Sequence, residues 1–144
     1  DALGFVGLLQ EARAEKLLAH YGLNRSQFTL LFLLGHDIGA YWTVSTLAQH
    51  MEMKAPGISK VVSQLGDKGW LEIKPDKVDK RKKHIHISDA GMEKRTLTLA
   101  ALQPFVARTF SGWTQAELKA FLAQLEKLKD WLENDRDMQL PKDP

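Results

Sequence analysis

The feature that most constrains the fold is a basic turn, residues 75–83, between two short segments in which apolar and polar side chains alternate. Before the turn, Leu71 and Ile73 alternate with charged residues. After it, Ile85 and Ile87 alternate with histidines. A period of two places one set of side chains on a buried face and the other set in solvent. The pattern therefore predicts a two-stranded β-ribbon with a cationic tip and these four apolar side chains on its core face.

A helical segment, residues 56–68, comes directly before this ribbon. Its apolar residues recur at helical spacing, with Pro56 in the first turn and Gly69 after the end, which are the positions that these two residues favour. The stripe consists of Ile58, Val61, Val62 and Leu65. The polar residues off the stripe, which we expect to face outward, are Lys54, Ser59, Lys60, Ser63 and Gln64.

A shorter helix is predicted at residues 45–51, with Thr43 as its N-cap. Two short helices joined by a tight turn make a helix-turn-helix, and the ribbon that follows makes it a winged one. A first helix is predicted at 3–20, ended by Gly22, and a second at 28–34, which begins with an Asn24–Gln27 capping box and is followed by a loop at 35–41. A long helix is predicted at 89–110, with Ser88 as its cap and a kink at Pro104. The last helix runs from a Thr114–Glu117 capping box to about 134.

The fold class that follows is mainly α, a winged helix-turn-helix with a two- or three-stranded β-wing and terminal helices that form a dimerisation region. We expect one domain over residues 1–144, with a winged lobe at 24–88 and dimerisation helices at 1–21 and 89–134. The terminal helices carry apolar stripes longer than one small domain can cover, which favours burial against a second copy of the chain. A two-fold dimer would place two recognition helices about 34–36 Å apart, one turn of DNA. The alternative is that these helices cover the core of a monomer.

Charge is unevenly distributed along the 144 residues. The net charge is only +2, but residues 54–86 hold nine Lys or Arg against four acids, a local +5 that leaves −3 elsewhere. A cationic face on a mildly acidic body suggests an anionic partner, although a solvated Lys-rich loop would give the same composition. A helix followed by a basic ribbon suits double-stranded DNA, since the helix fits the major groove and a tip arginine can enter the minor groove. The predicted DNA-binding residues are Lys54, Ala55, Pro56, Gly57, Ser59, Lys60, Ser63, Gln64, Asp79, Lys80, Arg81 and Lys82.

Other chemistry finds little support in the residues. The chain has no cysteine, which excludes disulfides and thiolate catalysis and fits a cytoplasmic protein. No apolar run approaches the length of a membrane span. His84 and His86 share one face of the ribbon, but no third metal ligand is evident and the adjacent lysines would repel a cation. No catalytic motif is present, so we expect no enzymatic activity, no metal and no cofactor.

The chain resembles the MarR-type (multiple antibiotic resistance) winged-helix regulators from about Gly7 to Leu132. Segments 23–28, 43–48 and 58–65 carry the resemblance, and its most specific part is Asp79-x-Arg81 followed by Ile85-x-Ile87-Ser88-x-x-Gly91. The resemblance implies a homodimer that binds a palindromic operator, usually as a repressor, with Arg81 in the minor groove and Asp79 holding its guanidinium. The sequence departs from the family at Lys60 and Ile73, where arginine is usual, and at Ser88, where threonine is usual.

The resemblance also implies release of DNA by a small aromatic or phenolic effector. We expect its pocket where the first two helices meet the start of the fifth, with Arg13, His36 and Trp42 as candidate ligands because an aromatic acid needs a cation and flat apolar walls. The alternative for these residues is a surface charge at Arg13 and plain core at Trp42. The alternative function is a protein-interaction or ligand-sensing winged helix with little DNA binding, motivated by the reduced number of arginines.

Overall fold

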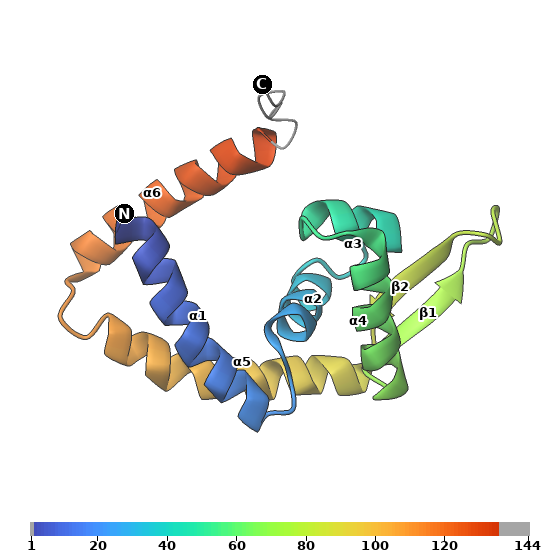
Figure 1. Cartoon of the computed structure of the whole chain (residues 1–144), viewed down its shortest axis with the longest axis horizontal. Helices are drawn as coiled ribbons and strands as arrows, with labels where there is room; N and C mark the ends of the chain where they lie inside the picture. The colour runs from blue at the N-terminus through green and yellow to red at the C-terminus, as the bar shows by residue number, and fades with distance from the viewer. Residues whose placement is uncertain (1, 136–144) are drawn as a thin grey trace, which may run out of the picture. The chain divides into compact units, whose positions relative to one another are not determined.

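The computed structural model of the chain describes residues 2–135. It divides into two compact units, with the boundary between Gln103 and Pro104. The elements are helices α1 (Ala2–His20), α2 (Arg25–His36), α3 (Val44–His50) and α4 (Ala55–Asp67), strands β1 (Leu71–Pro75) and β2 (Lys83–Ile87), and helices α5 (Asp89–Thr109) and α6 (Gln115–Asn134). This order is a winged helix-turn-helix flanked by terminal helices, so the predicted mainly α, winged-helix class is confirmed (Figure 1). The dimerisation role of the terminal helices stays a prediction.

Side-chain caps start the helices where the sequence predicts them. The Asn24 side chain accepts from the backbone N–H of Gln27, and the Gln27 side chain accepts from that of Asn24, so both halves of the capping box are present. Thr114 and Glu117 form the same reciprocal pair at the start of α6. Ser88 caps α5 by accepting from the backbone N–H of Gly91 at 3.0 Å. These bonds satisfy amide groups that have no partner within a helix, and so they fix each starting residue.

Three helices end in the same way. After α1, α3 and α4, the backbone N–H groups of the two residues past the cap bond back to carbonyls of the last turn, the paired arrangement known as a Schellman motif. The residue that turns left-handed is Gly22 after α1 (φ 69°) and Gly69 after α4 (φ 71°). After α3 it is Glu52 (φ 51°). The turn of the helix-turn-helix therefore places a side chain where its neighbours use glycine.

The core lies within the first unit and joins α2, α3, α4 and the wing. Leu30, Leu31 and Leu34 of α2 meet the predicted apolar stripe of α4, whose four members are all buried. Leu47 and Ala48 of α3 are buried with them, as predicted, while Met51 is half-buried. The second helix is longer than predicted, because Gly35 and His36 continue it and Asp37 is its C-cap.

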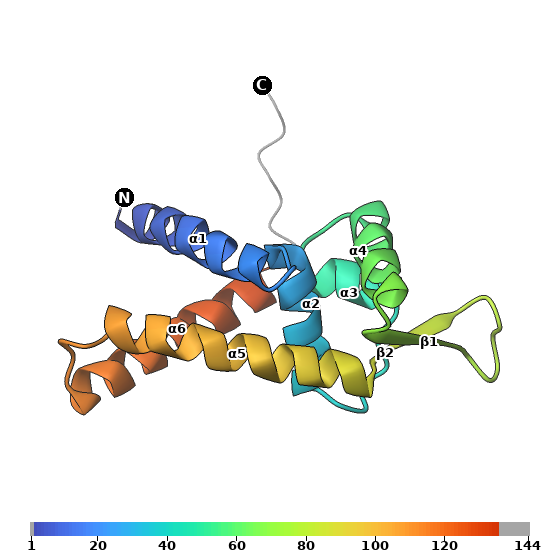
Figure 2. The same ribbon diagram turned by 90° about the horizontal axis from the view of Figure 1, so that it is seen from below.

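The wing is an antiparallel pair of strands in which Leu71 lies opposite Ile87 and Ile73 lies opposite Ile85. Leu71 and Ile85 are buried, and Ile87 packs against the core. The prediction for Ile73 is wrong, since 47% of its surface is exposed. Its strand continues past the point where the helices can cover it, and Figures 1 and 2 both show the hairpin projecting beyond α3 and α4. The edge of β2 is tied to the segment before α3 by the Ile85 N–H, which donates to the Trp42 carbonyl at 2.8 Å.

Gly91 lies against the root of the wing. A Cβ at this position would lie 2.1 Å from the Trp70 carbonyl oxygen and 2.9 Å from Ile87 Cγ1. That same carbonyl accepts the N–H of Ser88, and the Ser88 hydroxyl donates to the Gly69 carbonyl at 2.7 Å. A larger residue at position 91 would therefore push the start of α5 away from the wing.

The terminal helices leave much apolar surface uncovered. On α1, only Leu18 is buried, and Leu3, Phe5, Val6, Leu8 and Leu9 are exposed. None of the residues of α6, all of which lie in the described part of the chain, is buried, although the helix carries Phe121, Leu122, Leu125, Leu128, Trp131 and Leu132 along one stripe. In the second unit, the rings of Phe110, Trp113 and Phe121 contact one another. No described helix is long and apolar enough to cross a membrane.

Candidate nucleic-acid interface

The outer face of α4 is the first part of the candidate site. Because the apolar stripe of this helix is buried against α2 and α3, its polar residues are turned to the opposite side. The predicted contacts that are exposed there are Lys54, Ala55, Pro56, Ser59, Lys60 and Ser63. They present two ammonium groups and two hydroxyls, which are donors that bind phosphates and the edges of bases.

Gln64 differs from its prediction. Its side chain is half-buried, and its Oε1 accepts from Nε2 of Gln27 at 3.0 Å. Gln27 is itself buried and also serves the capping box at the start of α2. The two glutamines therefore join α2 to α4, and the prediction that Gln64 simply faces outward is wrong. The spacing along α4 could not reveal this, because the partner lies 37 residues away.

Gly57, in the first turn of α4, is half-buried. A Cβ there would lie 3.3 Å from Cε of Met53, the end of a flexible side chain. Within the protein, then, little opposes a larger residue at this position. Its role as a DNA contact stays a prediction.

The wing loop is the second part of the site. Its cations, Lys77, Lys80, Arg81 and Lys82, are all exposed, whereas its two acids, Asp76 and Asp79, are half-buried. The acids are turned inward because their carboxylates accept hydrogen bonds from the loop itself. The tip of the wing is therefore more positive toward solvent than its sequence of alternating charges indicates.

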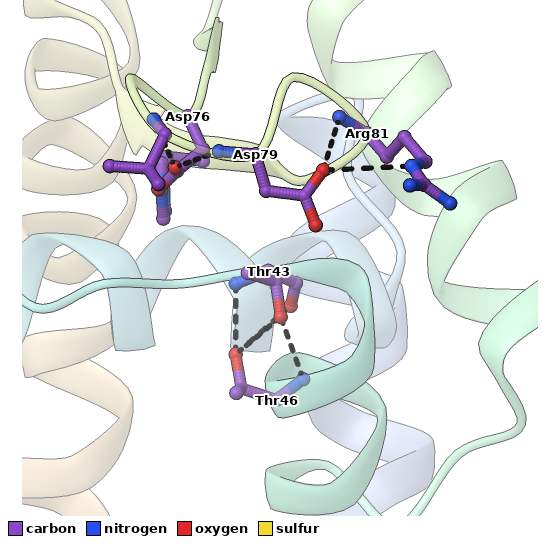
Figure 3. Close-up of polar contacts among 7 residues, drawn as sticks. Thr43, Thr46, Asp76, Asp79 and Arg81 are labelled. Carbon is purple, nitrogen blue, oxygen red and sulfur yellow. Dashed lines mark hydrogen bonds and ion pairs between the residues drawn. The ribbon is translucent and has the colours of Figure 1, made fainter.

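Asp79 and Arg81 lie as the resemblance implies. Oδ1 of Asp79 accepts from the backbone N–H of Arg81 at 3.1 Å and lies 3.8 Å from its Nε (Figure 3). The Arg81 side chain is 96% exposed, so its terminal nitrogens remain available to a partner. Asp79 thus orients the start of this side chain without covering its guanidinium.

Asp76 is an important residue that the sequence analysis missed. Its Oδ1 accepts from the backbone N–H groups of Val78 and Asp79 at 2.7 and 2.8 Å, and its Oδ2 lies 2.6 Å from Nε2 of His84. The hydrogen bond from His84 and those from Asp79 and Val78 hold the pKa of Asp76 well below its ordinary value. A Pro-Asp pair at the end of a strand is a known signal for such an aspartate-centred turn, but His84 lies eight residues further on.

The two histidines of β2 do not come together with a third ligand. His84 is engaged by Asp76 and by the ring of Tyr41, whose centroid lies 5.0 Å away. Among residues 2–135, no group of three or more side chains of the metal-binding types is close enough to hold an ion.

Of the three predicted effector ligands, Trp42 alone lines one of the two cavities described below. Arg13 is exposed on α1, and His36 is exposed and stacks on Phe32. Trp42 is half-buried against His50 and lines a small cavity of about 70 Å³ beside β2. The joint effector site of Arg13, His36 and Trp42 therefore stays a prediction.

A larger cavity, of about 290 Å³, does lie between α1, α2 and α5. This location agrees with the predicted pair of helices, but the cavity meets α5 at Leu102 and not at its start. An ion pair between Arg25 and Glu11 stands at its wall, beside Phe28. The complete lining is Gly7, Gln10, Glu11, Ala14, Leu18, Arg25, Phe28, Thr29 and Leu102.

Known proteins resemble the chain in both sequence and fold. The MarR family model matches residues 21–82. An HTH-type transcriptional regulator of Bacillus subtilis, YdcH, is 29% identical over 124 residues, which are 82% of this chain and 80% of that protein. The HTH-type transcriptional repressor IacR of Pseudomonas putida is 22% identical over 78% of this chain and 66% of its own length.

Solved structures agree in fold at low identity. The MepR–DNA complex of S. aureus superposes with a TM-score of 0.76 at 18% identity, covering 91% of this chain and 96% of that one. CouR of Rhodococcus jostii, bound to p-coumaroyl-CoA, gives a TM-score of 0.72 at 20% identity, covering 98% and 93% of the two chains. At these identities the structures establish the arrangement of the helices and the wing.

Proposed function

We propose that the chain is a MarR-type winged-helix transcriptional regulator, which binds double-stranded DNA as a homodimer and represses transcription from an inverted-repeat operator. In this proposal the exposed face of α4 enters the major groove. Arg81 enters the minor groove beside it, and the lysines of the wing contact phosphates. The observation that carries the proposal is the sorting of charge in the wing, whose cations are exposed while Asp76 and Asp79 are turned inward.

The homodimer is supported by the uncovered stripes of the terminal helices. A helix such as α6, with no buried residue and six large exposed apolar side chains, needs a partner surface to exclude water. A second copy of the chain would provide it through a two-fold axis, and the same axis would explain a symmetric operator. A regulator of this kind acts in the cytoplasm, where its DNA is.

The test is selection of bound fragments from random duplex DNA by the purified protein, followed by footprinting at low salt. We expect an enriched inverted repeat, protected symmetrically. Arg81→Ala should weaken binding to it by about 1–3 kcal/mol with the dimer intact. Lys60→Ala should weaken binding and make it less dependent on salt.

Lys16→Ala removes an exposed charge from α1, outside the winged lobe, and is the matched control that should bind as the unaltered protein does. If no inverted repeat is enriched, or if binding does not weaken with added salt, the chain is better described by the alternative of a protein-interaction or ligand-sensing winged helix.

We propose further that a small aromatic acid releases the DNA by binding in the cavity between α1, α2 and α5. Phe28 provides a flat apolar wall, and Arg25 provides the cation that a carboxylate needs. CouR, with p-coumaroyl-CoA bound, is a related fold that holds an aromatic acyl group. Titration of the protein–DNA complex with a panel of aromatic carboxylates should release DNA, and Arg25→Gln should abolish the release while leaving DNA affinity unchanged. Release that is equally effective with Arg25→Gln would place the ligand elsewhere.

A further inference from the structure

The loop at the tip of the wing, residues 76–82, is closed by one carboxylate. Asp76 accepts two backbone N–H groups of the loop on one oxygen and His84 on the other. Its own backbone N–H donates to the Lys82 carbonyl at 2.9 Å, and the Lys82 N–H donates to the Asp79 carbonyl at 2.8 Å. All of these bonds except the one to His84 join residues of the turn that carries Arg81, so the shape of the turn depends on Asp76.

His84 connects this loop to the body of the protein. A carboxylate can only accept, so Nε2 of His84 carries the proton that is donated to Asp76. The imidazole is 13% exposed and its edge or face meets the ring of Tyr41, which comes from the segment between α2 and α3. Lys74, the residue opposite His84 on β1, forms an ion pair with Glu72, with 2.9 Å between Nζ and Oε2. Asp76 is therefore the charged group that His84 engages.

The hydrogen bonds of Asp76 would order the wing loop before a partner binds. The exposed cations of the tip repel one another, and an unconstrained loop would lose conformational entropy at each of its residues on binding. A loop that is ordered before the partner arrives avoids that loss. The backbone N–H groups of Val78 and Asp79 donate to Asp76, and these two bonds fix the backbone just before Arg81 (Figure 3). Asp79 then orients Arg81 by accepting from its backbone N–H.

We propose that Asp76 and His84 are positioning residues for DNA binding, which together hold the wing loop in the shape that presents Arg81 to the minor groove. This inference rests on the proposed function. Neither residue needs to touch DNA, and the effect of each should pass through Arg81. Their contribution is separate from that of Asp79, which bonds to Arg81 directly.

The experiment uses the full-length protein and the duplex that the unaltered protein enriches from random DNA. His84→Leu removes the donor, and Asp76→Ala removes the acceptor. His84→Gln is the matched control, since a glutamine amide can donate from about the position of Nε2. We expect the two disruptive variants to weaken binding about tenfold, and no more than Arg81→Ala does, with His84→Gln close to the unaltered protein.

Double variants identify the route of the effect. In an Arg81→Ala background, His84→Leu should add little further loss, because the side chain that it positions is already gone. Equal binding by His84→Leu and the unaltered protein would overturn the proposal, and so would an undiminished loss in the Arg81→Ala background. Thermal unfolding of each variant, followed by circular dichroism, controls for general destabilisation, and Asp76→Ala at the tip of the wing tests the proposal should His84→Leu fail to fold.

Two spectroscopic readouts do not depend on DNA. The imidazole nitrogens of His84 should show protonated Nε2 in the unaltered protein and lose that preference in Asp76→Ala. The amides of Val78 and Asp79 should exchange faster in both disruptive variants. If the unaltered protein enriches no duplex, the proposed function fails and the positioning role fails with it. If it does enrich one and His84→Leu binds that duplex normally, the positioning role alone fails.

Discussion

The turn between α3 and α4 offers the sharpest test of the local physics of this chain. Glu52 occupies the left-handed position of a helix-ending motif that α1 and α4 complete with Gly22 and Gly69. A left-handed conformation costs a residue with a Cβ about 1–2 kcal/mol. Glycine avoids that cost, but its unfolded chain has more conformational freedom, so folding loses about 0.4–1 kcal/mol more entropy than with a residue that has a Cβ. Glu52→Gly should therefore stabilise the folded protein by about 0.5–1 kcal/mol.

Among the described residues, the Glu52 side chain makes no hydrogen bond or ion pair, so its removal breaks no interaction that would reduce this gain in stability. Urea unfolding at one fixed protein concentration would measure the change. Gly69→Ala and Gly22→Ala are the reciprocal variants. A Cβ at either position meets no atom within 4 Å, so each should lose about 0.5–1 kcal/mol, which is the backbone strain less the unfolded-state entropy that alanine removes. Glu52→Gln removes the charge but keeps the strain, and should change little.

No gain from Glu52→Gly, together with the expected losses in the two alanine variants, would refute this explanation. That result would mean that the side chain of Glu52 contributes as much as its backbone conformation costs. A gain from Glu52→Gln equal to that from Glu52→Gly would instead assign the effect to charge.

Three further predictions concern other parts of the molecule. Gly91→Ala should destabilise the protein by about 2–3 kcal/mol, because the new Cβ would overlap the Trp70 carbonyl. Gly66→Ala, where a Cβ meets nothing within 4 Å, is the control and should be neutral or stabilising in the same unfolding assay. If α6 lies in the proposed dimer interface, Leu125→Glu should break the dimer by placing an unpaired charge there, and sedimentation that shows an unchanged oligomer would remove α6 from that interface. Glu117 has a pKa lowered from 4.5 by the backbone and hydroxyl of Thr114, so its cap stabilises the protein above that pH and the stabilisation is lost as the pH falls through the lower folded value. Glu117→Gln should therefore flatten the stability profile in this acid range, and an unchanged profile would show that the cap contributes nothing.

Much of the site was predictable because its signals are local. The outward face of α4 follows from the spacing of Ile58 and Leu65, and the cations of the wing follow from an unbroken run in the chain. Arg81 and Asp79 are two residues apart, and so their contact follows from the turn. The contact made by Gln64 and the lining of the cavity between α1, α2 and α5 were not predictable in this way. Their neighbours come from α1, α2 and α5, and nothing in the spacing along one helix indicates which side of another helix it will meet.

The amino-acid sequence by itself determined where most of the helices and the wing lie, although it missed the end of α2 at His36. Caps such as Asn24, Thr114 and Ser88, and the ends at Gly22 and Gly69, act through bonds that span three to five residues, so they need no knowledge of the rest of the fold. Only the tertiary structure decided that Ile73 is exposed, that Gln27 holds Gln64 and that Asp76 holds His84. Those outcomes depend on where the packed body ends and on which side chains it brings together across long separations, and a hydrogen bond or a buried face exists only once both partners are in place.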